Sequence, residues 1–172
     1  MNAAEVGQSY TLQPSSASNS GSDQTTATGC LGLSREINAG PASGITQVEA
    51  DFTAGQSGPF FAEVLLTEPP IQFDSDYSQS VKDLASCRNL TIDSAGTSIA
   101  FTLMPINFAS GATAARLDGS LQGVQVNGYL AEQRIGQAAL LFFYFQIRSG
   151  SSQQAYALYT QAAAKANSKL TS

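Results

Sequence analysis

The sequence predicts a single α+β domain in which an antiparallel sheet of about five to seven strands is covered on one face by two helices. A length of 172 residues suits one domain and leaves too little for two independent cores. Hydrophobic residues make up 42% of the chain, which is enough to build a core. Alternating apolar and polar residues fill the middle of the sequence, whereas helical spacing recurs only twice. A block of strands with two helices favours a sandwich of helices on a sheet.

Residues 1–28 are rich in Ser, Thr, Gln, Asn and Gly, so we expect a flexible, largely irregular arm anchored by Tyr10 and Leu12. The single folded domain is expected to span residues 29–172. The N-terminus lacks a basic segment followed by an apolar stretch, so we expect a mature-like chain whose leader has been removed. The sequence also contains no apolar run of about 18 residues that could cross a membrane.

Two strands and a helix are expected to open the domain. Residues 46–53 alternate apolar and polar side chains, as a half-buried strand does, and residues 60–66 form a second strand that ends before a pair of prolines. Asp74 or Ser75 is expected to cap the helix. The apolar positions of that helix share one face: Tyr77, Val81, Leu84 and Ala85.

An antiparallel meander is expected to follow in the segments 90–93, 98–108, 113–117, 124–135 and 138–147. Gly136-Gln137 has the form of a two-residue hairpin loop and would join the last two strands. Asn127-Gly128 is a competing turn signal, but a turn there would leave a short strand facing a much longer one. A helix then closes the chain, beginning at the capping-box pattern of residues 151–154 and carrying a stripe of Ala, Leu and Tyr.

Cys30 and Cys87 are the two cysteines of the chain. They are either two buried free thiols or one disulfide, and a disulfide requires an oxidising compartment. Charged residues make up only 12% of the chain, and Ser, Thr, Gln, Asn and Gly are abundant, which favours the disulfide of an exported protein. The loop-entropy model gives such a bridge a stabilisation of roughly 4 kcal/mol. Because a CxxC motif is absent, we expect a structural bridge.

The composition excludes several classes of function. A net charge of −5 disfavours non-specific binding to nucleic acid. The chain contains no histidine, which excludes Ser-His-Asp, Cys-His and His-metal sites. Asp74-Ser75-Asp76 has a calcium-like spacing, but the rest of an EF-hand loop is missing and helix capping is the preferred interpretation. We therefore expect no enzyme, no catalytic residue, no metal and no cofactor, with a carboxylate-only enzyme as a remote third hypothesis.

The hairpin around Gly136-Gln137 provides the one candidate site. Its register would pair Leu130 with Phe143 on an apolar face beneath the helices, and Tyr129 with Tyr144 on the opposite, open face. That open face combines aromatic rings, an amide and a guanidinium, and it is predicted to bind a ligand through Tyr129, Phe142, Tyr144, Gln146 and Arg148. The alternative is the ordinary solvent face of an antiparallel sheet. An exposed Phe beside two tyrosines argues for a binding face, since it is an apolar patch that needs a partner.

The order of elements resembles that of a known family. A Ser-rich tether precedes Cys30, and the helical segment SVKDLASC ends in Cys87. The long hairpin GVQVNGYLAEQRIG-QAALLFFYFQ then leads to the Ala-rich segment QQAYALYTQAAAKA. This order is similar to that of actinobacterial, chiefly mycobacterial, secreted proteins and lipoproteins that share the fold of the extracellular sensor domain of a serine/threonine protein kinase. The family usually has two disulfides and often a Trp before the helix-end cysteine, whereas this chain has two cysteines and no Trp. The resemblance implies a non-catalytic, extracytoplasmic domain with a sheet cleft for an unidentified small molecule.

Two functions follow from these observations. The leading hypothesis is a secreted or cell-envelope binding or sensor-like domain for a small or amphipathic, lipid-like ligand. The second is a structural or interaction protein that docks another envelope protein through the exposed sheet face. Both hypotheses place the chain outside the cytoplasm, and neither involves nucleic acid.

Overall fold

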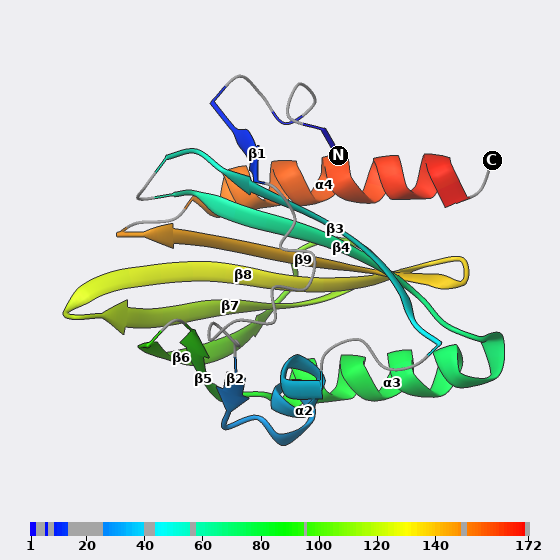
Figure 1. The fold of residues 1–172 in the computed structure, drawn as a ribbon, viewed down its shortest axis with the longest axis horizontal. Helices are drawn as coiled ribbons and strands as arrows, with labels where there is room; N and C mark the ends of the chain where they lie inside the picture. The colour runs from blue at the N-terminus through cyan, green and yellow to red at the C-terminus, as the bar shows by residue number, and fades with distance from the viewer. Residues whose placement is uncertain are drawn as a thin grey trace.

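In the part of the chain that the structure describes, nine antiparallel strands form one sheet, and helices cover both of its faces (Figure 1). The computed structural model describes residues 1–2, 6, 9–13, 26–39, 44–55, 58–94, 96–148 and 151–170. The strands are β1 (Thr11–Gln13), β2 (Thr26–Thr28), β3 (Thr46–Thr53), β4 (Phe60–Thr67), β5 (Asn89–Ser94), β6 (Thr97–Ile106), β7 (Ala112–Leu121), β8 (Val124–Ile135) and β9 (Ala138–Ile147). The helices among these residues are α2 (Leu31–Ala39), α3 (Pro70–Ser86) and α4 (Ser152–Leu170). Across the sheet, the strands lie in the order β1-β3-β4-β9-β8-β7-β6-β5-β2.

The helices lie on opposite faces of the sheet, which corrects the prediction that two helices cover one face. α4 packs on one face, here called the α4 face, and α3 lies with α2 on the other, the α3 face (Figure 1). The sheet has nine strands where five to seven were expected, and α2 is a helix that the sequence pattern did not predict. The physical reason lies in β9, whose apolar run projects hydrophobic side chains from both faces. Each face therefore needs a cover that excludes water.

The β8–β9 hairpin has the predicted register. Tyr129 pairs with Tyr144, and Leu130 pairs with Phe143. Gly136, in the loop, has a φ of 63°, a left-handed conformation that glycine adopts without a steric penalty. The predicted turn therefore sets the pairing of β8 and β9 at the centre of the sheet.

The competing turn signal, Asn127-Gly128, lies inside β8. A Cβ atom on Gly128 would lie 2.6 Å from the Tyr144 carbonyl oxygen and 2.7 Å from the Phe145 ring. Glycine is therefore required here for a packing reason, because its bare Cα lets the Phe145 ring lie against the strand.

Each face of the sheet has its own hydrophobic cluster. The cluster on the α4 face includes Phe52, Phe61, Tyr129, Phe142 and Tyr144 of the sheet, with Leu158 and Tyr159 of α4. The cluster on the α3 face includes Leu84 of α3 with Leu90, Phe101, Leu103, Leu117, Val126 and Leu130. The central strands thus divide two cores, and alternate residues of β8 and β9 belong to different ones.

α3 begins at Pro70, and not at the predicted cap, Asp74 or Ser75. Pro69 is the N-cap residue and Pro70 occupies the first turn. The N–H groups of the first turn have no partner within the helix, so a proline there costs no helical hydrogen bond. The proline pair that ends β4 therefore also starts the helix. The helix ends where predicted, because Cys87 has an extended backbone with ψ of 136°.

Three side chains of α3, one of them the predicted cap residue Asp74, connect the helix to β8. Arg134 Nη1 lies 2.6 Å from Asp74 Oδ1, and the Arg134 backbone N–H donates to the Tyr77 hydroxyl oxygen at 2.9 Å. Ser80 Oγ donates to the buried carboxylate of Glu132 at 2.9 Å. Asp74 is thus part of an ion pair with the sheet, which is a role that the local capping pattern does not show.

α4 matches its prediction closely. Ser151 Oγ accepts a hydrogen bond from the Gln154 backbone N–H at 3.2 Å, as a capping box requires. The buried side of the helix consists mainly of small residues: Ala155, Leu158, Tyr159, Ala162 and Ala166. The alanines let the helix approach the sheet closely, so its two larger side chains reach into the core.

The stretch expected to be an irregular arm contributes two short strands to the sheet. β1 pairs with β3 at one edge, and β2 pairs with β5 at the other. Tyr10 is buried, as an anchor should be, whereas Leu12 is 47% exposed. The expectation of irregular structure is therefore corrected for these two strands, residues 14–25 lie outside the described residues, and the boundary at residue 29 stays a prediction.

Candidate ligand site

α4 covers the face that was predicted to be open. Tyr129, Phe142 and Tyr144 do share one face, but their exposed fractions are only 6%, 0% and 0%. Gln146 is half-buried and Arg148 is exposed. The premise of an open aromatic face is therefore wrong, because the closing helix lies on this face while α3 lies on the other. The ligand-binding role of the five residues stays untested.

The buried aromatic residues pack against, and form hydrogen bonds with, other residues of the protein. The Phe142 and Tyr159 rings meet edge to face with centroids 5.6 Å apart. The Tyr144 hydroxyl oxygen lies 3.1 Å from Gln146 Oε1 and 3.2 Å from Gln154 Oε1. Burial raises the pKa of Tyr144 to about 12, so its hydroxyl stays neutral. These hydrogen bonds of the Tyr144 hydroxyl lie within the core under α4.

An open cavity begins where the cover of α4 ends. It has a volume of about 710 Å³ and lies on the α4 face of β7 and β8, beside the first turn of α4. We call it the β7–β8 cavity. Its lining residues are Arg116, Asp118, Gly119, Ser120, Gln125, Asn127, Tyr129 and Ser152. Tyr129 is the one member of the predicted set that lines it.

The β7–β8 cavity contains a fixed hydrogen-bond network. Arg116 donates to Asp118 Oδ1 through Nε at 3.0 Å and through an Nη atom at 2.8 Å. Asn127 Nδ2 donates to the same oxygen at 2.5 Å. The Arg116 side chain is 45% exposed and that of Asp118 is 30% exposed. No described residue donates to Asp118 Oδ2, so this oxygen is available to accept hydrogen bonds from a bound molecule.

Strand alternation positions these polar groups. Asp118 pairs with Asn127, and Ser120 pairs with Gln125, so the four side chains form two adjacent cross-strand pairs on one face. The next residues across β8 are Gln146 opposite Asn127 in β9, and Arg148 just beyond the strand. The Arg148 backbone N–H donates to the Gln125 carbonyl oxygen at 2.7 Å. Arg116 and Asp118 were not predicted as site residues, because the predicted register covered only the pairing of β8 with β9 and these two residues lie on β7. The alternating Arg-x-Asp-x-Ser pattern of β7 was the signal that could have identified them.

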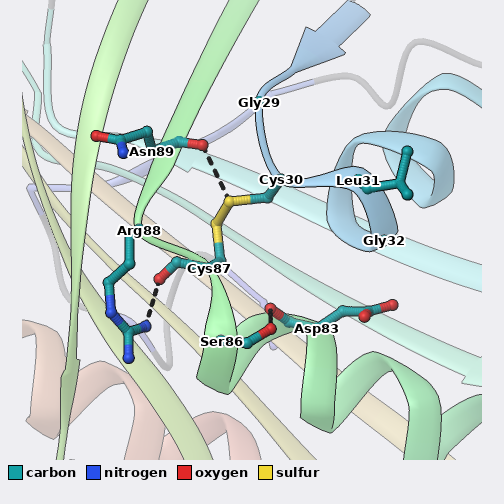
Figure 2. Close-up of a pocket in the computed structure, with 9 residues that line it drawn as sticks. All are labelled: Gly29, Cys30, Leu31, Gly32, Asp83, Ser86, Cys87, Arg88 and Asn89. Atoms are coloured by element: carbon teal, nitrogen blue, oxygen red, sulfur yellow. Dashed lines mark hydrogen bonds between the residues drawn. A yellow bond between two sulfur atoms is a disulfide. The ribbon is translucent and has the colours of Figure 1, made fainter.

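A second, smaller cavity of about 350 Å³ surrounds the disulfide (Figure 2). Cys30 and Cys87 are joined, with their Cα atoms 5.4 Å apart, as the sequence favours. Glycines provide the space here, because a Cβ on Gly29 would collide with the Asn89 carbonyl and one on Gly32 with the Asp83 carboxylate.

The polar groups of this disulfide cavity serve the fold. The Asn89 carbonyl oxygen lies 3.0 Å from Cys30 Sγ. Arg88 Nη1 donates to the carbonyl oxygens of Ala85 and Cys87 at 2.8 and 2.7 Å, which satisfies the end of α3. Figure 2 shows the bond to Cys87. Because the Arg88 guanidinium donates to backbone carbonyls and the Asp83 carboxylate accepts from Gln79 of the same helix, we assign this cavity a structural role and take the β7–β8 cavity as the candidate ligand site.

The chain is similar in fold to the extracellular domain of PknH from Mycobacterium tuberculosis. That crystal structure has a TM-score of 0.68 and 12% sequence identity, and the similarity covers 98% of this chain and 92% of that chain. At this identity the likeness shows the fold alone. It confirms the predicted resemblance to an extracellular domain at the level of the fold.

Comparison of sequences gives no further relative. No protein-family model matches the chain, and no curated protein matches its sequence. No enzyme family is therefore indicated. Within the described ranges, no helix combines the length and the apolar character that a membrane span requires.

Proposed function

We propose that the chain is a non-catalytic, extracytoplasmic binding domain of the sensor-like kind, and that its ligand occupies the β7–β8 cavity. The observation that carries the proposal is that the sheet face covered by α4 becomes accessible beside the first turn of the helix, where Arg116, Asp118 and Asn127 already form a hydrogen-bond network. A face that is buried along most of β8 opens into a cavity within the 300–1,000 Å³ range that is usual for small-molecule sites.

Location outside the cytoplasm has two supports. The fold is that of an extracellular domain, and a disulfide joins α2 to the end of α3. Disulfides persist in oxidising compartments and are rare in the cytosol. A secreted or cell-envelope location is therefore part of the proposal.

The proposed site shares only part of its residues with the site predicted from the sequence. Tyr129 remains as a lining residue of the cavity, whereas Gln146 and Arg148 are not among the lining residues and lie on the far side of β8, in β9 and just beyond it. Phe142 and Tyr144 are core residues. Arg116, Asp118 and Asn127, which the sequence did not nominate, become the central contacts.

Native mass spectrometry of protein purified from its own host tests the proposal. We expect a co-purifying small mass that is lost in Arg116→Ala and retained in Lys82→Ala. Lys82 is an exposed cation on α3, on the other side of the sheet, and is the matched control. A small mass that survives in Arg116→Ala would place the ligand elsewhere. The absence of any small mass would reject the binding domain.

Docking of another envelope protein is the second candidate function, and one observation favours it. Phe60 pairs with Phe145 on the α3 face, with Phe143 two residues further along β9, and these three rings are only partly buried. A protein mass that replaces the small mass in the same spectrum, and that is lost in Phe60→Ser, would support docking.

A further inference from the structure

We propose that the ligand of the β7–β8 cavity is a neutral, polyhydroxylated molecule, that is, a saccharide or a closely related polyol. This inference rests on the proposed function, since it takes the cavity as the binding site. Three properties of the residues at the cavity support it: their charges balance, they offer both hydrogen-bond donors and acceptors, and few of them are apolar.

The charge balance of the lining favours a neutral ligand. Among the described lining residues, Arg116 and Asp118 are the charged ones, and they are bonded to each other. Arg116 uses both Nε and one Nη atom on Asp118 Oδ1, so the side of the guanidinium that these two atoms form is not free for bidentate binding of a carboxylate or phosphate. An anion at this position would also lie beside the Asp118 carboxylate, and a cation beside the guanidinium. Either charge would be repelled by one member of the pair.

The remaining polar groups both donate and accept hydrogen bonds. Asn127 and Gln125 have amide N–H donors and carbonyl oxygens, and Ser120 and Ser152 have hydroxyls. Asp118 Oδ2 adds an acceptor. A sugar hydroxyl is likewise both a donor and an acceptor, so one such group can satisfy two neighbours at once. A simple amine or a carboxylate would leave half of this lining unmatched.

The spacing of these groups suits a ligand with several hydroxyls. Asp118 lies opposite Asn127, and Ser120 opposite Gln125, in consecutive pairs on one face. Cross-strand neighbours on one face lie about 5 Å apart, and successive side chains of one face about 7 Å apart along a strand. The result is a grid of four polar groups, and a molecule with a single polar end would fill only one corner of it.

Apolar side chains are few among the described lining residues. Tyr129 lines the cavity, and Met104 pairs with Arg116 from the neighbouring strand β6, with 43% of its surface exposed. This arrangement gives C–H and ring contacts for the less polar face of a sugar ring. It gives no apolar channel for an acyl chain, so a lipid-like ligand is disfavoured.

The test is a titration of the isotope-labelled full chain, followed by NMR of its side-chain amides. The probes are two neutral sugars, maltose and N,N′-diacetylchitobiose, together with citrate as an anion and hexanoate as an apolar acid. We expect a neutral sugar to shift the amide signals of Asn127 and Gln125 in a saturable way. Because no charge is involved, the affinity should be the same at low and high salt.

Variants make the result specific to the cavity. Gln125→Ala removes one exposed donor–acceptor group, and Ser120→Ala removes its cross-strand neighbour. Each should weaken sugar binding about tenfold, the effect of losing one hydrogen-bonding partner. Gln79→Ala, an exposed amide on α3, is the matched control and should bind as the wild type does. Unchanged binding in both cavity variants would overturn the proposal.

The outcomes separate this inference from the proposed function. If citrate or hexanoate shifts the cavity amides and the sugars do not, the ligand class is wrong and the cavity remains a binding site. If no probe shifts them, the saccharide class is also rejected, and the small mass in the native spectrum still decides the proposed function by itself.

Discussion

Phe142 and Phe143 are neighbours in β9 but lie on opposite faces with different burial. Phe142 has no exposed surface and contacts the rings of Phe61, Phe108 and Tyr159. We expect Phe142→Ala to lower the free energy of unfolding by about 3–5 kcal/mol, as core Phe truncations do. Phe143 is partly exposed on the α3 face, so Phe143→Ala should cost clearly less.

Urea unfolding of the two variants measures this difference directly. Equal midpoints, or a lower midpoint for Phe143→Ala, would show that α4 does not cover Phe142 in solution. The comparison is matched, since both variants lose the same side chain from the same strand.

The burial of these two residues shows how far the sequence could predict the site. Alternation and the Gly136 turn determine which residues share a face, and that prediction is confirmed by the register. Alternation does not show which face a helix covers, since both faces of β9 are apolar. Arg116 and Asp118 were missed for a related reason, because their place beside Asn127 depends on the pairing of a third strand.

At the scale of elements, the disulfide fastens α2 to the C-terminal end of α3. Reducing it should lower the melting temperature by roughly 10 °C, because loop closure of this length is worth about 4 kcal/mol. Calorimetry with and without a reductant measures the shift. The double variant Cys30→Ser, Cys87→Ser should not respond to the reductant. Two thiols that react under denaturing, non-reducing conditions would contradict the bridge.

Elements with strong local signals could be predicted, and those that depend on distant partners could not. The bounds of β3, β8, β9 and α4 follow from periodicity and turn residues. α2 is short, with nine residues, and is held by tertiary contacts that local propensity does not report. Asn38 of α2, for example, bonds both the N–H and the carbonyl of Ala27 in β2, at 2.6 and 2.8 Å. β1 and β2 have three residues each, too few for a pattern.

At the scale of the whole molecule, buried tyrosines predict a loss of stability in alkaline solution. Burial, as the largest cause, raises the pKa values of Tyr144 and Tyr159 to about 12, from about 10 in the unfolded chain. The unfolded state therefore releases protons first as the pH rises. The stabilisation is complete below pH 10 and is lost progressively as the pH rises toward 12.

Urea unfolding between pH 9 and pH 12 tests this dependence, with the pH range set by those two pKa values. The free energy of unfolding should fall by a few kcal/mol across the interval. Tyr144→Phe removes one of the two groups, so its stability should fall less steeply. A wild-type curve that is flat over this range would mean that the two rings are accessible to water.

The order of the strands also has a consequence for how the chain folds as it is made. β5 to β9 pair with their neighbours in sequence, so this half can assemble hairpin by hairpin. β4 pairs with β9 instead, Thr67 with Ala138 and Phe60 with Phe145. The β3–β4 hairpin leaves the ribosome early but lacks its neighbour until the last strand has been synthesised. Completion of the first-made hairpin therefore waits for the last-made strand, and the seam between β4 and β9 should be among the last contacts to form.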